Sequence, residues 1–180
     1  MRNKQLRTLC EGAVMVALSV VISFIKIKTG GQGGSIDFVM IPLLLFALRN
    51  GCLWGIGAGA VFGFIKCLVG GGIGYGLPSV LLDYVLAYAA VGFAGIAKNK
   101  KYGALWGTAL GCIARFGIHF ISGLTIYAIT AAEEIAGIIT ANVPLYSLIY
   151  NGLYMLPNTV VALIIMPIVA KALKNTAYHI

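Results

Sequence analysis

The sequence predicts an all-α integral membrane protein, a bundle of six transmembrane helices with both termini in the cytoplasm. The chain has 180 residues, of which 60% are hydrophobic and only 10% are charged. Soluble domains carry about 25% charged residues, so this composition indicates a chain that lies in lipid. Apolar runs of membrane-spanning length recur from end to end, and we therefore expect one transmembrane domain over residues 1–180.

Six apolar segments account for the predicted helices. They are Leu6–Ile27, Ile36–Leu48, Leu53–Val69, Leu77–Ala97, Tyr102–Ile129 and Leu145–Leu173. The second is short for a crossing of about 20 residues and is expected to start below the outer surface. Pro157 and Pro167 are expected to break the last segment, because proline removes a helix hydrogen bond and crowds the preceding turn. The amphipathic stretch Glu133–Val143 is expected to form a small interfacial helix.

Lysine and arginine residues set the predicted orientation of the bundle. With the N-terminus in the cytoplasm, the cytoplasmic side receives Arg2, Lys4, Arg7, Arg49, Lys98, Lys100, Lys101, Lys171 and Lys174. Only Lys26 and Lys28 fall in an outer loop. Cytoplasmic loops carry the excess of positive charge, and an even number of helices returns the C-terminus to the side where the chain starts.

Composition and motifs exclude several classes of protein. The net charge is +8, but the basic residues lie at the ends of apolar runs, as topology signals do, so no nucleic-acid partner is expected. The sequence contains no phosphate-binding loop for ATP, no HExxH zinc motif and no GxSxG nucleophile motif. Its four cysteines are far apart and form no CxxC pair. We therefore expect no enzyme, no cofactor and no resident metal, and uphill transport must draw its energy from a partner or an ion gradient.

A small set of polar residues lies within the predicted membrane segments, where an ionised side chain costs roughly 2.5–3.5 kcal/mol on insertion scales. The set comprises Asp37, Asp83, Arg115, His119, Tyr146 and Asn151, with Tyr150 and Tyr154 nearby. These residues lie on different predicted helices, and all of them fall in the outer half of the bundle. Their convergence predicts one polar pocket that opens outward. A carboxylate flanked by tyrosines suits an organic cation, through charge pairing and cation–π contact.

Structural roles for the same residues stay open at this point. Asp83 and Arg115 can form an ion pair between helices that touches no ligand. His119 can be a packed histidine, and tyrosines at an outer boundary can belong to an interfacial belt. The glycine-rich loop Gly30–Ser35 can be a plain connector or a lid over the pocket.

Four stretches of the chain together resemble one known family. They are QGGSIDFVMIPLLLFALRNG (Gln32–Gly51), LLDYVLAYAAVGFAG (Leu81–Gly95), RFGIHFISG (Arg115–Gly123) and LYSLIYNGLYMLP (Leu145–Pro157). In this order and spacing they resemble the YuaJ/ThiT-type thiamine transporters, the substrate-binding S components of energy-coupling-factor (ECF) transporters. The resemblance covers nearly the whole chain and implies a six-helix bundle in a prokaryotic cell membrane.

The resemblance also implies a high-affinity thiamine pocket near the outer surface, covered by the loop between the first two helices. When the family's functional residues are matched to this sequence one by one, the resemblance implies substrate contacts at Asp83, Arg115, His119, Tyr146 and Asn151. It also implies one at Asp37, at the start of the second helix. Some members have tryptophans around the ligand, but Trp54 and Trp106 fall near cytoplasmic helix ends here. The expected aromatic surface therefore comes from Tyr127, Tyr146 and either Tyr75 or Tyr84.

Ala13 and Ala17 on the first helix allow two interpretations. They can be ordinary small residues that pack inside the bundle. The resemblance implies instead an Ala-x-x-x-Ala surface on which an S component docks the transmembrane coupling protein of its ECF module, which carries two ATPases.

Three functions follow from this reading of the sequence. The leading one is a thiamine-binding membrane subunit that delivers its substrate through an ATP-driven ECF module. The second is a self-sufficient proton-coupled carrier that uses Asp83 or His119 as its proton site. The third is an S component of the same fold for a different vitamin or an amphiphile.

Overall fold

The computed structural model describes residues 2–28, 35–128 and 131–173. Within these residues five apolar helical spans are long enough to cross a membrane, so the chain is a multi-pass membrane protein. The spans are α1 (Arg2–Ile22), α3 (Cys52–Gly70), the run Leu77–Ala97, α6 (Gly103–Thr125) and α7 (Val143–Leu173). The predicted mostly helical membrane fold is thus confirmed, whereas the count of six crossings and the side of the termini stay predictions.

A shorter apolar helix, α2 (Met40–Asn50), has 11 residues and lies among the longer spans. It packs against α1, α3, α6 and α7, and Leu44, Phe46 and Ala47 are almost fully buried. A helix surrounded by other helices is apolar on all its faces, which explains why this segment is short yet strongly hydrophobic.

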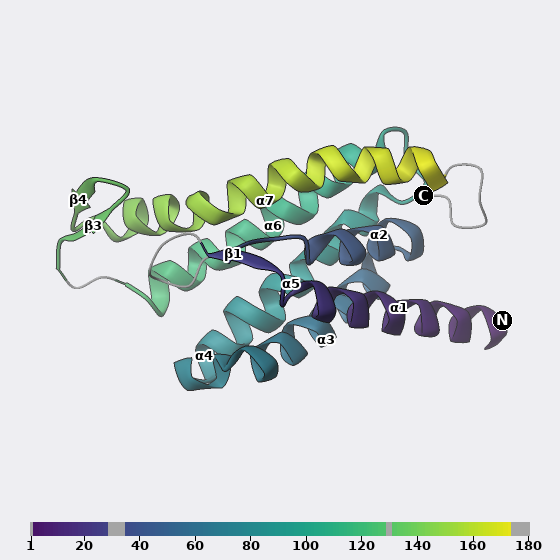
Figure 1. Cartoon of the computed structure of the whole chain (residues 1–180), viewed down its shortest axis with the longest axis horizontal. Helices are drawn as coiled ribbons and strands as arrows, with labels where there is room; N and C mark the ends of the chain where they lie inside the picture. The colour runs from purple at the N-terminus through teal and green to yellow at the C-terminus, as the bar shows by residue number, and fades with distance from the viewer. Residues whose placement is uncertain (1, 29–34, 129–130, 174–180) are drawn as a thin grey trace.

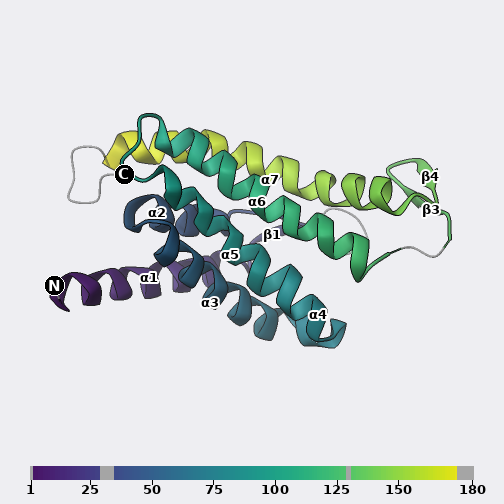
Figure 2. The same cartoon turned by 180° about the vertical axis from the view of Figure 1, so that it is seen from behind.

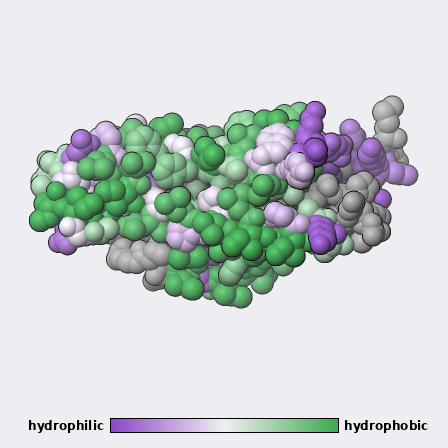
Figure 3. Space-filling view, turned by 90° about the horizontal axis from the view of Figure 1, so that it is seen from above, coloured by the Kyte–Doolittle hydropathy of each residue, from purple (hydrophilic) through white to green (hydrophobic). Residues whose placement is uncertain are grey.

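Figures 1 and 2 show the helices running roughly along one axis, with α6 and α7 side by side. The helix α1 begins, and α7 ends, at the same end of the molecule, opposite the end that carries the strands β3 and β4. Figure 3 shows a mostly apolar face along the bundle and hydrophilic residues gathered at the end where α1 begins. Exposed side chains such as Ile113, Ile164 and Ile168 therefore face lipid rather than water.

Two short hairpins make the all-α prediction wrong in detail. The strand β1 (Lys26–Lys28) pairs with β2 (Ser35–Asp37), where the sequence predicted ends of the first two helices. Of the loop between these strands, residues 29–34 lie outside the described residues, so the lid prediction for Gly30–Ser35 stays a prediction.

The predicted interfacial helix at Glu133–Val143 is also wrong. That stretch instead contains β3 (Glu133–Ile135) paired with β4 (Ile138–Thr140), and α7 begins at its last residue. The two turn residues Ala136 and Gly137 have φ of 52° and 79°. Two successive positive φ values match the tight turn that suits a β-hairpin, so the turn at Gly137 overrides the amphipathic pattern.

The predicted break in the last segment is wrong as well. Pro157 and Pro167 both lie inside α7, which continues over 31 residues. Transmembrane helices tolerate proline because neighbouring helices and small local adjustments satisfy the freed carbonyl groups. Figure 1 accordingly shows α7 as one long, gently curved helix.

The span Leu77–Ala97 has the predicted bounds but is not a regular α-helix. It consists of α4 (Leu77–Ser79), the π-helical turn η2 (Val80–Leu86), α5 (Ala87–Val91) and the 3₁₀ turn η3 (Gly92–Ala97). Turns of π-helix inside a longer helix are rare and occur frequently at functional sites. Here the π-helical turn carries Asp83.

Three glycines on α3 set how closely this irregular span approaches the bundle. Gly55, Gly59 and Gly63 recur every fourth residue, and each faces the backbone of η3, α5 or η2. A methyl group on Gly63 would overlap the carbonyl oxygen of Tyr84, the residue that follows Asp83. Small residues at this spacing let two helix backbones touch, so α3 fixes the position of η2.

We expect Gly63→Ala to lower stability and to displace η2. The new methyl group meets rigid backbone, and overpacking of this kind typically costs about 1–3 kcal/mol. Gly57→Ala is the matched control, because a Cβ there meets nothing within 4 Å. Melting curves in detergent should show a clearly lower melting temperature for Gly63→Ala and an unchanged one for Gly57→Ala. Equal melting temperatures for the two variants would contradict the close packing.

Candidate functional site

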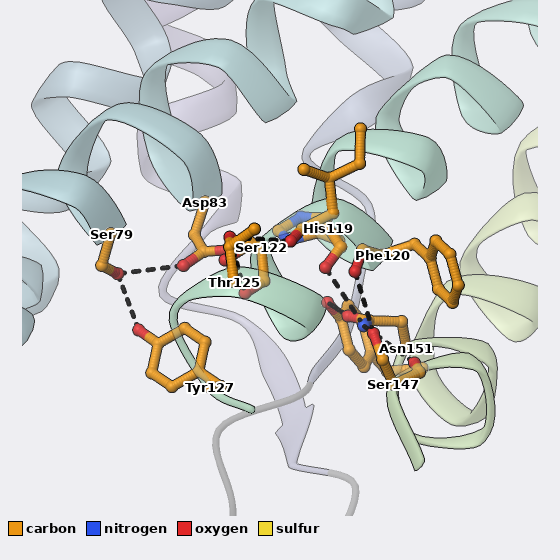
Figure 4. A network of polar contacts seen from close by, with 11 residues as sticks. Ser79, Asp83, His119, Phe120, Ser122, Thr125, Tyr127, Ser147 and Asn151 are labelled. Carbon is orange, nitrogen blue, oxygen red and sulfur yellow. Dashed lines mark hydrogen bonds and ion pairs between the residues drawn. The ribbon is translucent and has the colours of Figure 1, made fainter. Parts of the chain in front are cut away.

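The strongest polar cluster joins η2 to α6 (Figure 4), in the half of the bundle opposite the start of α1 (Figure 1). The carboxylate of Asp83 lies 3.3 Å from Nδ1 of His119 and accepts a hydrogen bond of 3.0 Å from the hydroxyl of Ser79. The hydroxyl groups of Ser79 and Tyr127 are 2.7 Å apart. Since Ser79 gives its one proton to Asp83, Tyr127 is the donor in the second contact, and a chain of donors ends on the carboxylate.

The imidazole of His119 has one nitrogen engaged and one open. Its Nδ1 faces Asp83, while Nε2 is buried and has no hydrogen-bond partner among the described residues. A neutral ring that donates from Nδ1 presents Nε2 as an acceptor, and a protonated ring presents it as a donor. A buried polar atom without a partner costs about 1–3 kcal/mol, so Nε2 is suited to a ligand group.

Three tyrosines on α7 form an aromatic row that leads to His119. Tyr146 and Tyr150 stack with ring centres 6.3 Å apart, and Tyr150 meets Tyr154 edge to face at 5.9 Å. Tyr154 in turn meets the His119 ring edge to face at 5.9 Å. The spacing of four residues places the tyrosines on one face of the helix, and their rings offer a flat surface for a heterocycle.

Asn151 ties α7 to α6 within the same region (Figure 4). Its amide nitrogen donates to the backbone carbonyl of His119 at 3.3 Å and to the carbonyl of Ser147 at 2.9 Å. Its amide oxygen accepts a hydrogen bond of 2.7 Å from the hydroxyl of Tyr154. Ser147 adds a second tie, because its hydroxyl donates to the carbonyl of Phe120 at 3.0 Å. Both side chains therefore fix the distance between the two helices.

A second polar layer lies one helical turn deeper, where Arg115 and Lys66 converge on one aromatic ring. The guanidinium carbon of Arg115 is 4.2 Å, and the ammonium of Lys66 5.3 Å, from the ring centre of Tyr88. Arg115 is only 5% exposed, and its Nε and Nη1 have no hydrogen-bond partner among the described residues. Its ion pair with Asp83, left open by the sequence, is not formed in the described part of the chain.

Asp37 belongs to this deeper layer rather than to the Asp83 cluster. Its carboxylate lies 3.3 Å from the ammonium of Lys66 and 3.4 Å from the backbone nitrogen of Val39. Asn158 of α7 accepts from the backbone nitrogen of Asp37 and donates to the carbonyl of Ser35, each at 2.9 Å. Asn158 thus joins β2 to α7. The carboxylate and the backbone nitrogen of Asp37 are both engaged by other protein groups.

The structure brings most, but not all, of the predicted site residues together. Asp83, His119, Asn151 and Tyr127 meet through the contacts above, and Tyr146 joins them through the aromatic row. The ring of Tyr84 lies over Gly72 in the turn η1 (Gly72–Tyr75). The side chain of Tyr75 lies outside the described part of the chain.

Several residues of the site were missed by sequence reasoning. They are Ser79, Tyr88, Ser147 and Asn158. A usable signal existed for two of them, because Ser79 precedes Asp83, and Ser147 precedes Asn151, by one helical turn. Nothing in the local sequence indicated that Tyr88 would face two cations.

The two alanines of α1 lie on the outer face of the bundle. Ala13 and Ala17 are exposed, whereas Gly12, Val16 and Ser19 face inward. The structure therefore contradicts the first interpretation, in which the two alanines pack inside the bundle. Together with the exposed Val14, Leu18 and Val21 they leave an apolar stripe along α1.

The combined arrangement suits the binding of a ligand. A carboxylate, an open imidazole nitrogen and a row of aromatic rings together can hold a flat cationic heterocycle. Among the described residues no group of three or more histidine, cysteine, aspartate and glutamate side chains is placed to hold a metal ion.

Comparison with known proteins agrees with this chemistry. The family described as "Thiamine transporter protein (Thia_YuaJ)" matches residues 9–178. The "Thiamine transporter ThiT" of Bacillus subtilis (strain 168) is 29% identical over 180 residues, with 92% of this chain and 91% of that protein covered. The protein of the same description from Lacticaseibacillus paracasei (strain ATCC 334) is 28% identical, with 92% and 87% covered.

A solved structure extends the likeness to three dimensions. The structure described as "Native-SAD phasing for ThiT from Listeria monocytogenes serovar." has a TM-score of 0.79 and 26% identity, with 94% of this chain and 96% of that chain covered. The family match spans nearly the whole chain, and the chain therefore belongs to the thiamine transporter protein (Thia_YuaJ) family.

Proposed function

We propose that this chain binds thiamine at the Asp83–His119 cluster and acts as the S component of an ECF transporter in a prokaryotic cell membrane. The observation that carries the proposal is the pairing of Asp83 with His119 beside a row of tyrosines, with Nε2 of His119 buried and open. Family membership supplies the substrate class, and the cluster supplies a chemistry that matches it.

Thiamine has two heterocycles that fit these groups. Its thiazolium is permanently cationic, so the carboxylate of Asp83 can balance the charge and recover part of its own cost of burial. Its aminopyrimidine has an N–H donor and ring nitrogens that accept. The open Nε2 of His119 can pair with that edge, while Tyr146, Tyr150 and Tyr154 provide aromatic faces.

Arg115 and Asn151 support the pocket from behind in this proposal. The buried Nε and Nη1 of Arg115 lie one turn below His119 on the same helix and can donate to a ligand or to bound water. Asn151 is engaged by His119, Ser147 and Tyr154, so it holds α6 and α7 at the spacing that the ligand requires.

The energy for uptake comes from elsewhere in this scheme. The sequence has no nucleotide-binding motif, so an ATP-driven ECF module is the proposed partner. The exposed stripe with Ala13 and Ala17 is the proposed docking surface, because small side chains let a partner helix approach closely.

A proton-coupled carrier is the second candidate, and one observation favours it. Asp83 and His119 form a carboxylate–imidazole pair within membrane-spanning helices, an arrangement that pumps and transporters use to exchange protons. In that scheme the chain accumulates thiamine alone and needs no ATPase partner.

We expect the detergent-purified chain to bind thiamine tightly without ATP or a partner, and Asp83→Asn to weaken that binding by at least about 2 kcal/mol. The empty variant should melt close to wild type, because Arg115 does not depend on Asp83 for an ion pair. Calorimetric titration measures the affinity.

Glu134→Gln is the matched control for this titration, since it removes one negative charge from the exposed strand β3 at the same end of the bundle. It should leave the affinity unchanged. Absence of binding by the wild-type chain, with riboflavin or biotin bound instead, would reject thiamine as the substrate.

Ala13→Trp and Ala17→Trp should abolish uptake and co-purification with the ECF module while leaving thiamine affinity at the wild-type value. The added bulk blocks the approach of a partner helix but lies outside the bundle. Leu153→Trp, another exposed position on a different helix, is the control and should leave uptake intact. Accumulation of thiamine in proteoliposomes that contain this chain alone and a proton gradient would establish the carrier function instead.

A further inference from the structure

A cavity of about 280 Å³ lies at the other end of the molecule, far from the Asp83 cluster. It opens where α1 begins, α2 ends and α3 begins. Its lining residues are Lys4, Gln5, Thr8, Asn50, Trp54 and Lys98. This set contains two ammonium groups and four other side chains able to hydrogen bond, and it contains no carboxylate.

The positive charge of this cavity is not balanced by the protein. Lys4 and Lys98 have no ion pair among the described residues. The nearby carboxylate of Glu11 is already neutralised, because it lies 2.7 Å from Nη1 of Arg49. Asn50 donates to the same carboxylate at 3.4 Å, so Glu11 is turned toward protein groups rather than toward the cavity.

The start of α3 adds to the positive potential. The residue before its first turn is Gly51, no side chain caps it, and the first turn has no acidic residue. A helix N-terminus carries a partial positive charge equivalent to roughly half an elementary charge. Trp54 lies in this first turn and also lines the cavity.

The walls of the cavity are held in place. The hydroxyl of Thr8 donates to the amide oxygen of Asn50 at 3.3 Å, which joins α1 to the end of α2. The amide nitrogen of Asn50 also donates to the carbonyl of Phe46 at 3.3 Å. Because these contacts hold two of the helices that line the cavity at a fixed spacing, the cavity is available to a ligand without rearrangement of their backbones.

The surroundings of the cavity match the membrane–water interface. Leu53, beside Trp54, is 84% exposed, and Leu9, beside Thr8, is 59% exposed. Tryptophan is enriched at the level of lipid headgroups, and apolar side chains beside it face acyl chains. Basic pockets between helices on the side rich in anionic lipid bind phosphate headgroups.

We propose that this cavity is a binding site for a phosphate-bearing anion, with Lys4 and Lys98 as its charged contacts. An anionic phospholipid headgroup fits best, because its acyl chains can follow the exposed leucines while its phosphate lies between the two ammonium groups. Free inorganic phosphate shares the same chemistry without the apolar contacts. This site does not involve the residues proposed to bind thiamine, so its test is independent of the test of the proposed function.

Native mass spectrometry of the detergent-purified chain tests the site, with phosphatidylglycerol and phosphatidylcholine as lipid probes. The wild-type chain should retain phosphatidylglycerol in preference to phosphatidylcholine. The double variant Lys4→Gln with Lys98→Gln should lower that preference by roughly thirtyfold, the scale expected for two basic contacts near a membrane surface. Its thiamine affinity and melting temperature should stay at the wild-type values.

The double variant Lys100→Gln with Lys171→Gln is the matched control, because it removes the same charge from exposed positions outside the cavity lining. It should keep the lipid preference.

Displacement of the lipid by millimolar inorganic phosphate would assign the site to free phosphate as well. Equal loss in both double variants, or no preference in the wild type, would overturn the proposal. A cavity variant that keeps its lipid preference but loses assembly with the ECF module would overturn it in favour of a protein partner.

Discussion

The contact between the Asp83 carboxylate and the His119 imidazole is the interaction around which the candidate site is organised. It joins η2 to α6 within the apolar part of the chain, where an ionised group needs a partner. The hydroxyl of Ser79 also donates to the carboxylate, and the hydroxyl of Tyr127 contacts that of Ser79. The pair leaves one imidazole nitrogen open, and the proposed binding of thiamine uses this atom.

Close backbone packing makes that contact possible. Gly59 and Gly63 let α3 touch the carbonyl groups of Tyr88 and Tyr84, so the π-helical turn is pressed against the bundle with Asp83 turned toward α6. On the other side, Asn151 sets the spacing of α6 and α7 through hydrogen bonds. The site is therefore held by backbone contact on one face and by side-chain hydrogen bonds on the other.

The sequence predicted the parts of this molecule that follow from hydropathy and from local spacing. Membrane spans and the short second helix have such signals. The sequence named only Arg115 as a possible ion-pair partner of Asp83, whereas the structure pairs Asp83 with His119, four residues further along α6 on the same helix face. The two hairpins escaped prediction because three-residue strands show no periodicity, and the π-helical turn has no compositional mark at all. Asp37 was expected in the same polar pocket as Asp83; in the structure its carboxylate contacts Lys66 of α3, a helix whose rotation the sequence does not fix.

The most direct measurement is a structure of the chain determined with thiamine bound. We predict the ligand between Asp83 and the row formed by Tyr146, Tyr150 and Tyr154, with Nε2 of His119 within hydrogen-bond distance of the aminopyrimidine. The glycine contacts of α3 should be unchanged. Thiamine bound elsewhere, with Asp83 and His119 still paired as in the empty chain and Nε2 still without a partner, would contradict the assignment of the site.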